Sequence, residues 1–282
     1  MKTLGDVLTL TADFLKDKQL PRARRTAEEM VAHSLKIKRL DLYMQFDRPV
    51  LESELEILRP MLKRAAKGEP VEYITGEVSF YHCAIKVTPH VLIPRPETEI
   101  LVDQACRLLK AEQKPGLHAW DVCTGSGCIG IAVKKACPDL TMALSDRSAE
   151  ALQVAQENAE KNGVEVELRC GDLLEPFCGS KADVVFCNPP YVSDKEFIEL
   201  GRSVKDFEPK EALCGGADGG DFYRRLSAEL PALLNPGAKV FLEIGNQQGE
   251  LLKALFSGKE WKTARLEKDW SGHDRFFFLE FE

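Results

Sequence analysis

The 282-residue chain lacks long apolar runs, and this absence argues against a membrane protein. No apolar stretch approaches the roughly 20 residues that a membrane-spanning helix needs. The opening segment, residues 1–6, does not have the form of a signal peptide. Apolar content of 44% and charged content of 29% are typical of a globular protein. We therefore expect a cytoplasmic protein without a membrane partner.

Motifs for metal binding are also missing. The nine cysteines include no CxxC pair, and the five histidines show no HExxH or similar ligand spacing. An odd and scattered set of cysteines does not predict a disulfide framework, so a reducing compartment is expected. The sequence thus predicts no metal site, and the nine cysteines are interpreted as small core residues.

Positive charge is scarce over most of the chain, whose net charge is −7. Residues 1–75 hold 14 Lys/Arg against 12 Asp/Glu, whereas the remainder holds 24 against 33. A groove that follows nucleic-acid phosphates needs a positive potential. We therefore predict no stable nucleic-acid binding, although a local basic patch could survive this average.

Hydrophobic periodicity divides the chain into two domains. Apolar residues recur at helical spacing in three segments, around 4–15, 27–35 and 51–66. After a Gly-Glu-Pro boundary at 68–70, residues 77–87 alternate apolar and polar side chains in the manner of a hairpin. We predict a helical domain over 1–72, a linker with a β-hairpin over 73–94, and a larger domain over 95–282. The helical domain is interpreted as a substrate-recognition module, with a purely structural cap as the alternative.

The larger domain alternates strands and helices, which predicts an α/β fold of Rossmann-like type with a parallel sheet covered on both faces. Two strand-like runs at the end, separated by the loop 269–274, predict an antiparallel strand near one edge of the sheet. The expected strands span about 117–123, 140–145, 165–170, 183–187, 238–244, 263–268 and 275–281. The expected helices, after an amphipathic one through 100–109, span about 127–136, 149–162, 220–234 and 247–257.

The tetrapeptide Asn188-Pro189-Pro190-Tyr191 directly follows the fourth expected strand. Two prolines cannot continue a sheet ladder, so the backbone must leave the sheet in extended form. Ligands of open α/β sheets bind at this carboxyl end of the strands. The Asn188 side chain and the freed proline carbonyls can accept hydrogen bonds from a planar NH2 group. The alternative is an ordinary loop that ends a strand.

A glycine-rich loop, residues 123–130, joins the first sheet strand to its helix. Its glycines allow close approach of a ligand, and the helix N-terminus offers free N–H groups to an anion. Asp146 ends the next strand, where a carboxylate can accept hydrogen bonds from both ribose hydroxyls. Asp172 follows the third strand and can read an adenine edge together with a neighbouring backbone N–H.

The same loop fits the GxGxxG pattern of NAD-binding proteins, which is a weak motif on its own. Two features favour S-adenosylmethionine over NAD. Asp121 precedes the glycines and could reach the ammonium of an amino-acid moiety, and hydride transfer has no use for the proline tetrapeptide. We predict a cofactor site formed by Cys123, Thr124, Gly125, Ser126, Gly127, Asp146, Asp172, Leu173 and Asn188.

Five separated motifs stand in order along the chain: residues 67–70 with 73–76, 93–99, 124–127, 188–191 and 207–209. Together they resemble the HemK/PrmC family, the methyltransferases that modify a glutamine of peptide-chain release factors, over essentially the full length. The resemblance implies a helical N-terminal domain, a seven-stranded methyltransferase domain dependent on S-adenosylmethionine, and a Gly-Gly-Gln loop of a release factor as the substrate. Cys123 departs from the family, which usually has Gly there, so a slightly shifted loop is expected.

The resemblance also implies roles for single residues. Asn188 would accept a hydrogen bond from one N–H of the glutamine amide, and the Pro189 carbonyl would accept one from the other N–H. Tyr191 would form a wall of the pocket. Asn188, Pro189 and Tyr191 are therefore the expected catalytic residues, and Pro190 joins them in binding the substrate. Glu208 and Arg275 are interpreted as residues that order loops. Arg95, Glu97 and Thr98 are expected to order the loop covering the cofactor, or to be salt-bridged scaffolding; Glu243 receives no role.

Three other functions stay open. The same tetrapeptide can grip an exocyclic amine, as in adenine-N6 methylation of DNA or RNA; the acidic balance and the absence of a basic recognition domain argue against it. Methylation of a ribosomal-protein glutamine is the second. A cofactor-binding module without catalysis is the third, and the intact Asn188 and Tyr191 argue against it.

Overall fold

The computed structural model describes residues 2–282, which form two compact units. Among the described residues, the helical unit comprises 2–76 together with Gly201–Phe207, and the larger unit comprises Glu77–Leu200 and Glu208–Glu282. The short return of residues 201–207 to the helical unit has no counterpart in the sequence pattern.

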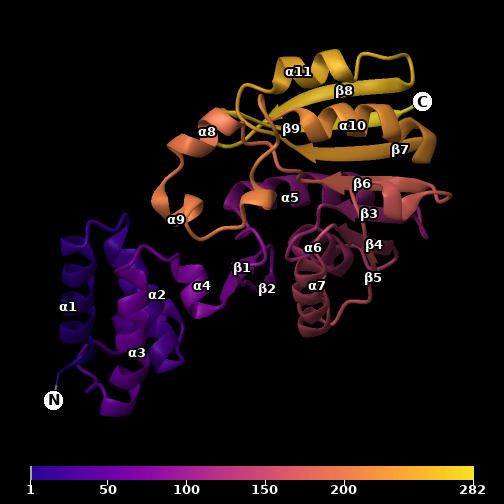
Figure 1. The fold of residues 1–282 in the computed structure, drawn as a ribbon. Helices are drawn as coiled ribbons and strands as arrows, with labels where there is room; N and C mark the ends of the chain where they lie inside the picture. Colours follow the sequence, from indigo (N-terminus) through magenta and orange to yellow (C-terminus); the bar gives the residue numbers. More distant parts are fainter. Residues whose placement is uncertain (1) are drawn as a thin grey trace. The chain divides into compact units, whose positions relative to one another are not determined.

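The helical unit packs three main helices around a small apolar core (Figure 1). Helix α1 starts at a capping box, in which the Asp6 backbone N–H donates to Thr3 Oγ1 at 3.2 Å and the Thr3 N–H donates to Asp6 Oδ2 at 3.0 Å. Leu8 and Met30 of the predicted apolar stripes are fully buried, whereas Leu10 and Phe14 of the first stripe are 50% and 39% exposed. The elements are α1 (Leu4–Asp17), α2 (Ala23–Leu35), η1 (Arg39–Met44), α3 (Glu52–Ala65), α4 (Val71–Thr75) and α9 (Arg202–Lys205).

The predicted antiparallel hairpin is present as β1 (Glu77–Phe80) and β2 (Cys83–Lys86). It belongs to the larger unit rather than to a separate linker. Asn158 of helix α7 (Ala149–Asn162) attaches it to the core of that unit. Its amide oxygen accepts from the Lys86 N–H at 2.6 Å, and its Nδ2 donates to the carbonyls of Lys86 and Ser126 at 3.0 and 2.9 Å. One buried side chain therefore joins the hairpin to the glycine-rich loop.

The seven-stranded sheet has the order β5-β4-β3-β6-β7-β9-β8. All neighbours are parallel except at β9, which is antiparallel to both β7 and β8. The predicted antiparallel strand near the edge is thus confirmed, and with it the α/β class. The strands are β3 (His118–Val122), β4 (Thr141–Asp146), β5 (Glu167–Cys170), β6 (Ala182–Cys187), β7 (Leu234–Glu243), β8 (Trp261–Lys268) and β9 (Asp274–Phe281).

Helices cover both faces of this sheet (Figure 1). Helices α5, α6 and α7 pack on one face, and α10 and α11 pack on the other. Along β7, Val240 and Leu242 face α10 and α11, while Phe241 stacks on Phe186 of β6 at 5.3 Å on the opposite face. The remaining elements are α5 (Pro96–Glu112), α6 (Cys128–Ala136), η2 (Glu175–Phe177), α8 (Asp194–Glu199), η3 (Lys210–Ala212), α10 (Asp221–Glu229), η4 (Leu230–Leu233) and α11 (Gly249–Leu255).

The strand order explains where a ligand can enter. The chain runs from β3 outward to β4 and β5, and then returns to β6 on the other side of β3. The loops after β3 and β6 therefore diverge, and such a reversal leaves a crevice at the carboxyl ends of the strands.

Candidate active site

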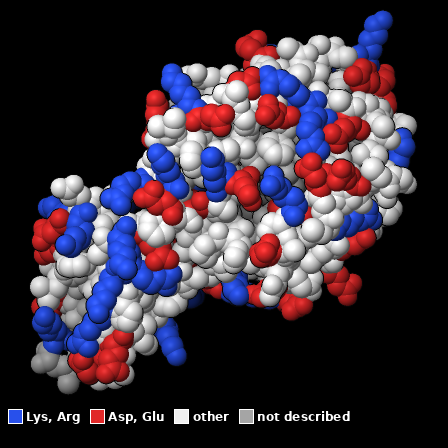
Figure 2. Space-filling model, in the orientation of Figure 1, with Lys and Arg blue, Asp and Glu red and all other residues white. Residues whose placement is uncertain are grey.

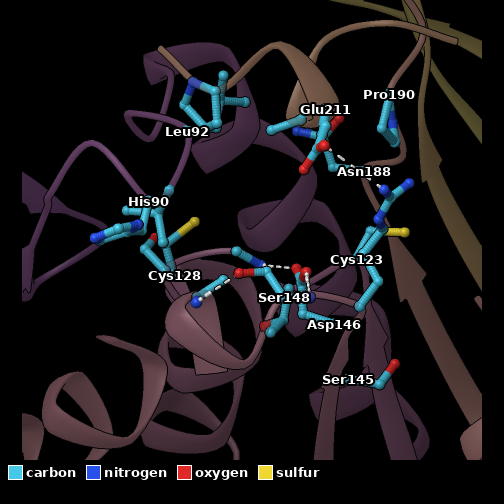
Figure 3. Close-up of a pocket in the computed structure, with 18 of the residues that line it drawn as sticks. His90, Leu92, Cys123, Cys128, Ser145, Asp146, Ser148, Asn188, Pro190 and Glu211 are labelled. Carbon is cyan, nitrogen blue, oxygen red and sulfur yellow. Dashed lines mark hydrogen bonds and ion pairs between the residues drawn. The ribbon is translucent and has the colours of Figure 1, made fainter. Parts of the chain in front are cut away.

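A cavity of about 340 Å³ lies at this crevice. Figure 3 shows Asp146 and Ser148 along one wall, with Asn188 and Pro190 across the cavity from them. The volume is in the range of small-molecule sites, roughly 300–1,000 Å³. Eight of the nine residues predicted to bind the cofactor line it, namely Cys123, Thr124, Gly125, Ser126, Asp146, Asp172, Leu173 and Asn188.

Gly127, the ninth, stands behind the lining and shapes the loop. It is the N-cap of α6 with φ +80°, a left-handed conformation that favours glycine. A Cβ there would lie 2.7 Å from Ile131 Cδ1 and 3.1 Å from Ala155 Cβ. Its role in this structure is to let α6 start close against α7.

Asp121 also lies behind the lining, fully buried at the end of β3. Its Oδ2 accepts from Thr124 Oγ1 at 2.6 Å and from the Gly130 N–H at 2.9 Å, which holds the loop in its curve. Burial raises the pKa of this carboxyl to about 7. Its Oδ1 has no hydrogen-bond partner among the described residues, and the sequence-based idea that Asp121 reaches a ligand ammonium stays a prediction.

Asp146 is both a wall residue and an anchor for the loop. Its Oδ2 accepts from the Gly125 N–H at 2.9 Å and its Oδ1 from the Ser148 N–H at 3.0 Å. Burial raises the pKa of Asp146, while these backbone N–H groups oppose the rise. Neighbouring Ser145 also lines the cavity, and its buried Oγ has no hydrogen-bond partner among the described residues. This wall therefore offers a carboxylate to a ligand.

Cys123 adopts φ +58°, a left-handed conformation in which a side chain is strained. This explains physically why glycine suits the position. The Cys123 side chain packs against the core cluster that contains Cys187, and it still lines the cavity.

Asp172 lines the cavity and also forms an ion pair with Arg225 of α10, with Oδ2 and Nη1 2.8 Å apart. No pattern in the sequence indicated this partner. Leu173 follows with φ +50° and is buried, so the chain turns sharply after β5.

Only two residues of the tetrapeptide after β6 line the cavity. Asn188 and Pro190 line the cavity, whereas the buried Pro189 and the half-buried Tyr191 lie outside the lining. Gln248 fixes the exit of this segment, because its Nε2 donates to the carbonyls of Tyr191 and Gly219 at 3.0 and 3.2 Å.

The segment that covers the cavity contributes six residues to its wall, namely Pro89, His90, Val91, Leu92, Pro94 and Arg95. The sequence indicated Arg95 as a residue that orders a loop over the cofactor, but it did not indicate the other five. Glu208 holds this segment: its Oε2 accepts from the Ile93 N–H at 3.1 Å, and Arg95 Nη2 lies 2.6 Å from its Oε1. On the rim, Arg147 and Glu211 face each other at 3.8 Å (Figure 3). Pro-Arg-Pro-Glu was the one available signal for this segment.

Two family models match the chain: the PrmC N-terminal domain over residues 6–76 and the methyltransferase small domain over residues 99–203. The release factor glutamine methyltransferase of Chlamydia trachomatis serovar D is 40% identical over 97% of this chain and 93% of its own length. That of Geobacter sulfurreducens is 36% identical over 97% of this chain and 95% of its own. The chain belongs to the release factor glutamine methyltransferase family. The relative in Bacillus subtilis strain 168, 36% identical over 98% of this chain, carries the same name.

Solved structures support the fold of a methyltransferase. A methyltransferase from Pyrococcus furiosus matches with a TM-score of 0.52 and 19% identity, covering 70% of this chain and 88% of its own. The 16S rRNA N2 G1207 methyltransferase of Thermus thermophilus, in complex with AdoMet and guanosine, matches with a TM-score of 0.54 and 16% identity, covering 73% and 50%. At these identities the likeness concerns the fold alone.

Two kinds of feature are absent from residues 2–282. None of their helices is long and apolar enough to cross a membrane. No cluster of three or more His, Cys, Asp or Glu side chains in that range could hold a metal ion.

Proposed function

We propose that the chain transfers a methyl group from S-adenosylmethionine to the side-chain amide nitrogen of the glutamine in the Gly-Gly-Gln loop of peptide-chain release factors. It would act in the cytoplasm, in support of translation termination. The observation that carries this proposal is the presence of Asn188 and Pro190 on the wall of the cavity that Asp146 also lines, in a chain of this family. The wall with Asp146 suits a nucleoside, and the wall with Asn188 suits an NH2 group.

The cavity residues fit the cofactor, which supplies a methyl group on a cationic sulfur when it is bound. Asp146 would accept hydrogen bonds from the ribose hydroxyls, and the glycine-rich loop would allow the methionine part to approach its backbone closely. Asp172 and Leu173 would contact the adenine, with Asp172 remaining beside Arg225.

Positioning would supply most of the catalysis. An amide nitrogen is a poor nucleophile, because its lone pair is delocalised into the carbonyl. Asn188 would accept one N–H of the substrate amide and the Pro189 carbonyl the other, with Pro190 and Tyr191 closing the pocket. Both acceptors bind more strongly as positive charge develops on the nitrogen. Well-oriented reactants gain up to roughly 7–11 kcal/mol.

Substitution of the tetrapeptide tests this assignment. Asn188→Ala should lower methyl transfer severely, by roughly 100-fold or more if its contribution is of the size seen for one positioned donor or acceptor in other enzymes. Binding of S-adenosylmethionine, measured by calorimetry, should stay within a few fold. Near wild-type turnover would contradict the assignment.

The substrate is tested by incubating the protein with methyl-labelled S-adenosylmethionine and a release factor. Label should appear on the release factor and disappear when the glutamine of its Gly-Gly-Gln loop is changed to Ala. Label on ribosomal proteins, or on DNA or RNA only, would identify one of the other two methylation reactions. Absence of label on every substrate, with the cofactor bound, would indicate a binding module.

The charge distribution favours a protein substrate. On the face shown in Figure 2, Lys and Arg side chains are interspersed with Asp and Glu.

The same proposal assigns roles to the domains: substrate recognition to residues 1–72, a linker to 73–94 and catalysis to 95–282. Their support is the match of residues 6–76 to the PrmC N-terminal domain.

A further inference from the structure

Glu243 is a buried carboxylate for which the proposed chemistry has no use. It is the last residue of β7, at the same edge of the sheet as the cavity, and only 1% of its surface is exposed. Its Oε2 accepts from Thr98 Oγ1 at 2.6 Å, and its Oε1 accepts from the Tyr191 hydroxyl at 3.3 Å. One carboxylate thus connects the first turn of α5 with the tyrosine of the proline tetrapeptide.

A buried carboxylate is costly, because its charge leaves water. Burial raises the pKa of Glu243, while Thr98 and the nearby guanidinium of Arg275 oppose the rise. A residue needed only to fill space at this strand end could be apolar. The retention of a carboxylate, with one hydroxyl donor on each oxygen, indicates that the carboxylate positions these hydroxyls.

Tyr191 is the residue whose position depends on this contact. Its backbone carbonyl is held by Gln248, so the Glu243 contact fixes the other end of the residue, the hydroxyl. Gly245 lies against the ring, since a Cβ at Gly245 would stand 3.2 Å from Tyr191 Cδ2. Tyr191 is therefore fixed at both ends, directly after Pro190 in the cavity wall.

We propose that Glu243 is a positioning residue of the methyl-transfer site, which acts through the Tyr191 hydroxyl to hold the segment from Asn188 to Tyr191 in place for the substrate amide. Thr98 in turn fixes the carboxylate. The proposal rests on the proposed function, because the rate it affects is that of glutamine methylation.

The test is a double-mutant cycle of Glu243→Gln and Tyr191→Phe. The first change keeps the shape and removes the charge, and the second removes only the phenol hydroxyl. In the wild-type background, Glu243→Gln should lower kcat by roughly 10- to 100-fold, the range for one hydrogen bond to a charged group. In the Tyr191→Phe background the same change should have little further effect, because its partner is gone. Equal losses in both backgrounds, or no loss in either, would overturn the proposal.

A second readout does not depend on activity. Hydrogen exchange of the amides at 188 and 191–193 should rise in Glu243→Gln, with the affinity for S-adenosylmethionine within a few fold. The same exchange should rise in Thr98→Val. Glu250→Gln on α11, whose side chain is exposed and paired with Lys253, is the matched control and should change neither measurement. If exchange rises but the wild type labels no release factor, only the proposed function fails. Unchanged exchange with an active wild type would refute the positioning role.

Discussion

Cys123 has a left-handed backbone conformation and also lines the cavity. A non-glycine residue in this conformation costs roughly 1–2 kcal/mol, whereas glycine pays a smaller entropic cost of about 0.5–1 kcal/mol. We expect Cys123→Gly to change the free energy of unfolding by about 1 kcal/mol or less, since relief of strain offsets lost packing. Cys123→Val, with its β-branch, should destabilise by about 1–2 kcal/mol and narrow the cavity.

Urea unfolding measures both Cys123 variants, and calorimetry with S-adenosylmethionine measures the cavity. The Gly variant should bind within a few fold of wild type and the Val variant more weakly. A Gly variant that loses cofactor binding would show that the thiol itself contacts the ligand.

Asp121 makes stability depend on pH. Burial raises the pKa of its carboxyl to about 7 in the folded chain, above the ordinary value of 3.8. The folded state therefore binds the proton more tightly than the unfolded state. The resulting stabilisation is complete below about pH 4 and is lost as the pH rises through about 7, with a slope of at most about 1.4 kcal/mol per pH unit.

The comparison of wild type with Asp121→Asn isolates this carboxyl, because Asp146 and Glu243 also have raised pKa values and contribute with the same sign. Unfolding by urea at several pH values between about 4.5 and 8, without cofactor, should show a shallower decline for the variant. Identical slopes would mean that Asp121 does not titrate in this range.

At the scale of elements, close backbone approach around the proline tetrapeptide explains two glycines. Gly219 has φ +75°, and a Cβ there would lie 2.1 Å from the Tyr191 carbonyl oxygen. Gly215 is equally confined, since a Cβ there would lie 2.4 Å from the Pro190 carbonyl oxygen. Gly179 has φ +82° with nothing within 4 Å of such a Cβ, so it serves as a control with the same strain as Gly219. Gly179→Ala should cost about 1–2 kcal/mol of stability and leave activity intact.

Gly219→Ala should cost more stability than its control, and it should lower kcat because the tetrapeptide must shift. Urea unfolding and labelled methyl transfer measure the two effects. Equal behaviour of the two variants would mean that the loop after residue 213 adjusts without moving Tyr191.

Much of this arrangement could be predicted from the sequence. Short apolar runs bounded by turn residues indicated the seven strands of the sheet, because a strand buried in a sheet needs apolar side chains along its length. The short helices α4 and α9 are too brief for a periodic signal. Contacts across the chain, such as Asp172 with Arg225 or Thr98 with Glu243, join residues 53 and 145 positions apart, and no local pattern encodes such pairs.

At the scale of the whole molecule, the two units differ in charge and in exposed apolar surface. The catalytic unit is acidic, which supports a protein partner over nucleic acid. In the helical unit, Leu40 and Met44 of η1 are 73% and 84% exposed, with the half-exposed Tyr43 beside them in sequence. Exposed apolar side chains of this kind are typical of protein interfaces.

The recognition role that we propose for the helical unit predicts a split between binding and chemistry. Leu40→Glu combined with Met44→Glu should raise KM for a release factor by roughly tenfold or more, since central apolar contacts contribute over about 1 kcal/mol each in interfaces. The kcat at saturating release factor should change little, because no residue of the cavity wall is altered. Trp270→Ser is the control: this side chain is 89% exposed in the loop between β8 and β9, and its removal should leave KM unchanged. A helical unit that is only a structural cap would give the same KM for the double variant and the wild type.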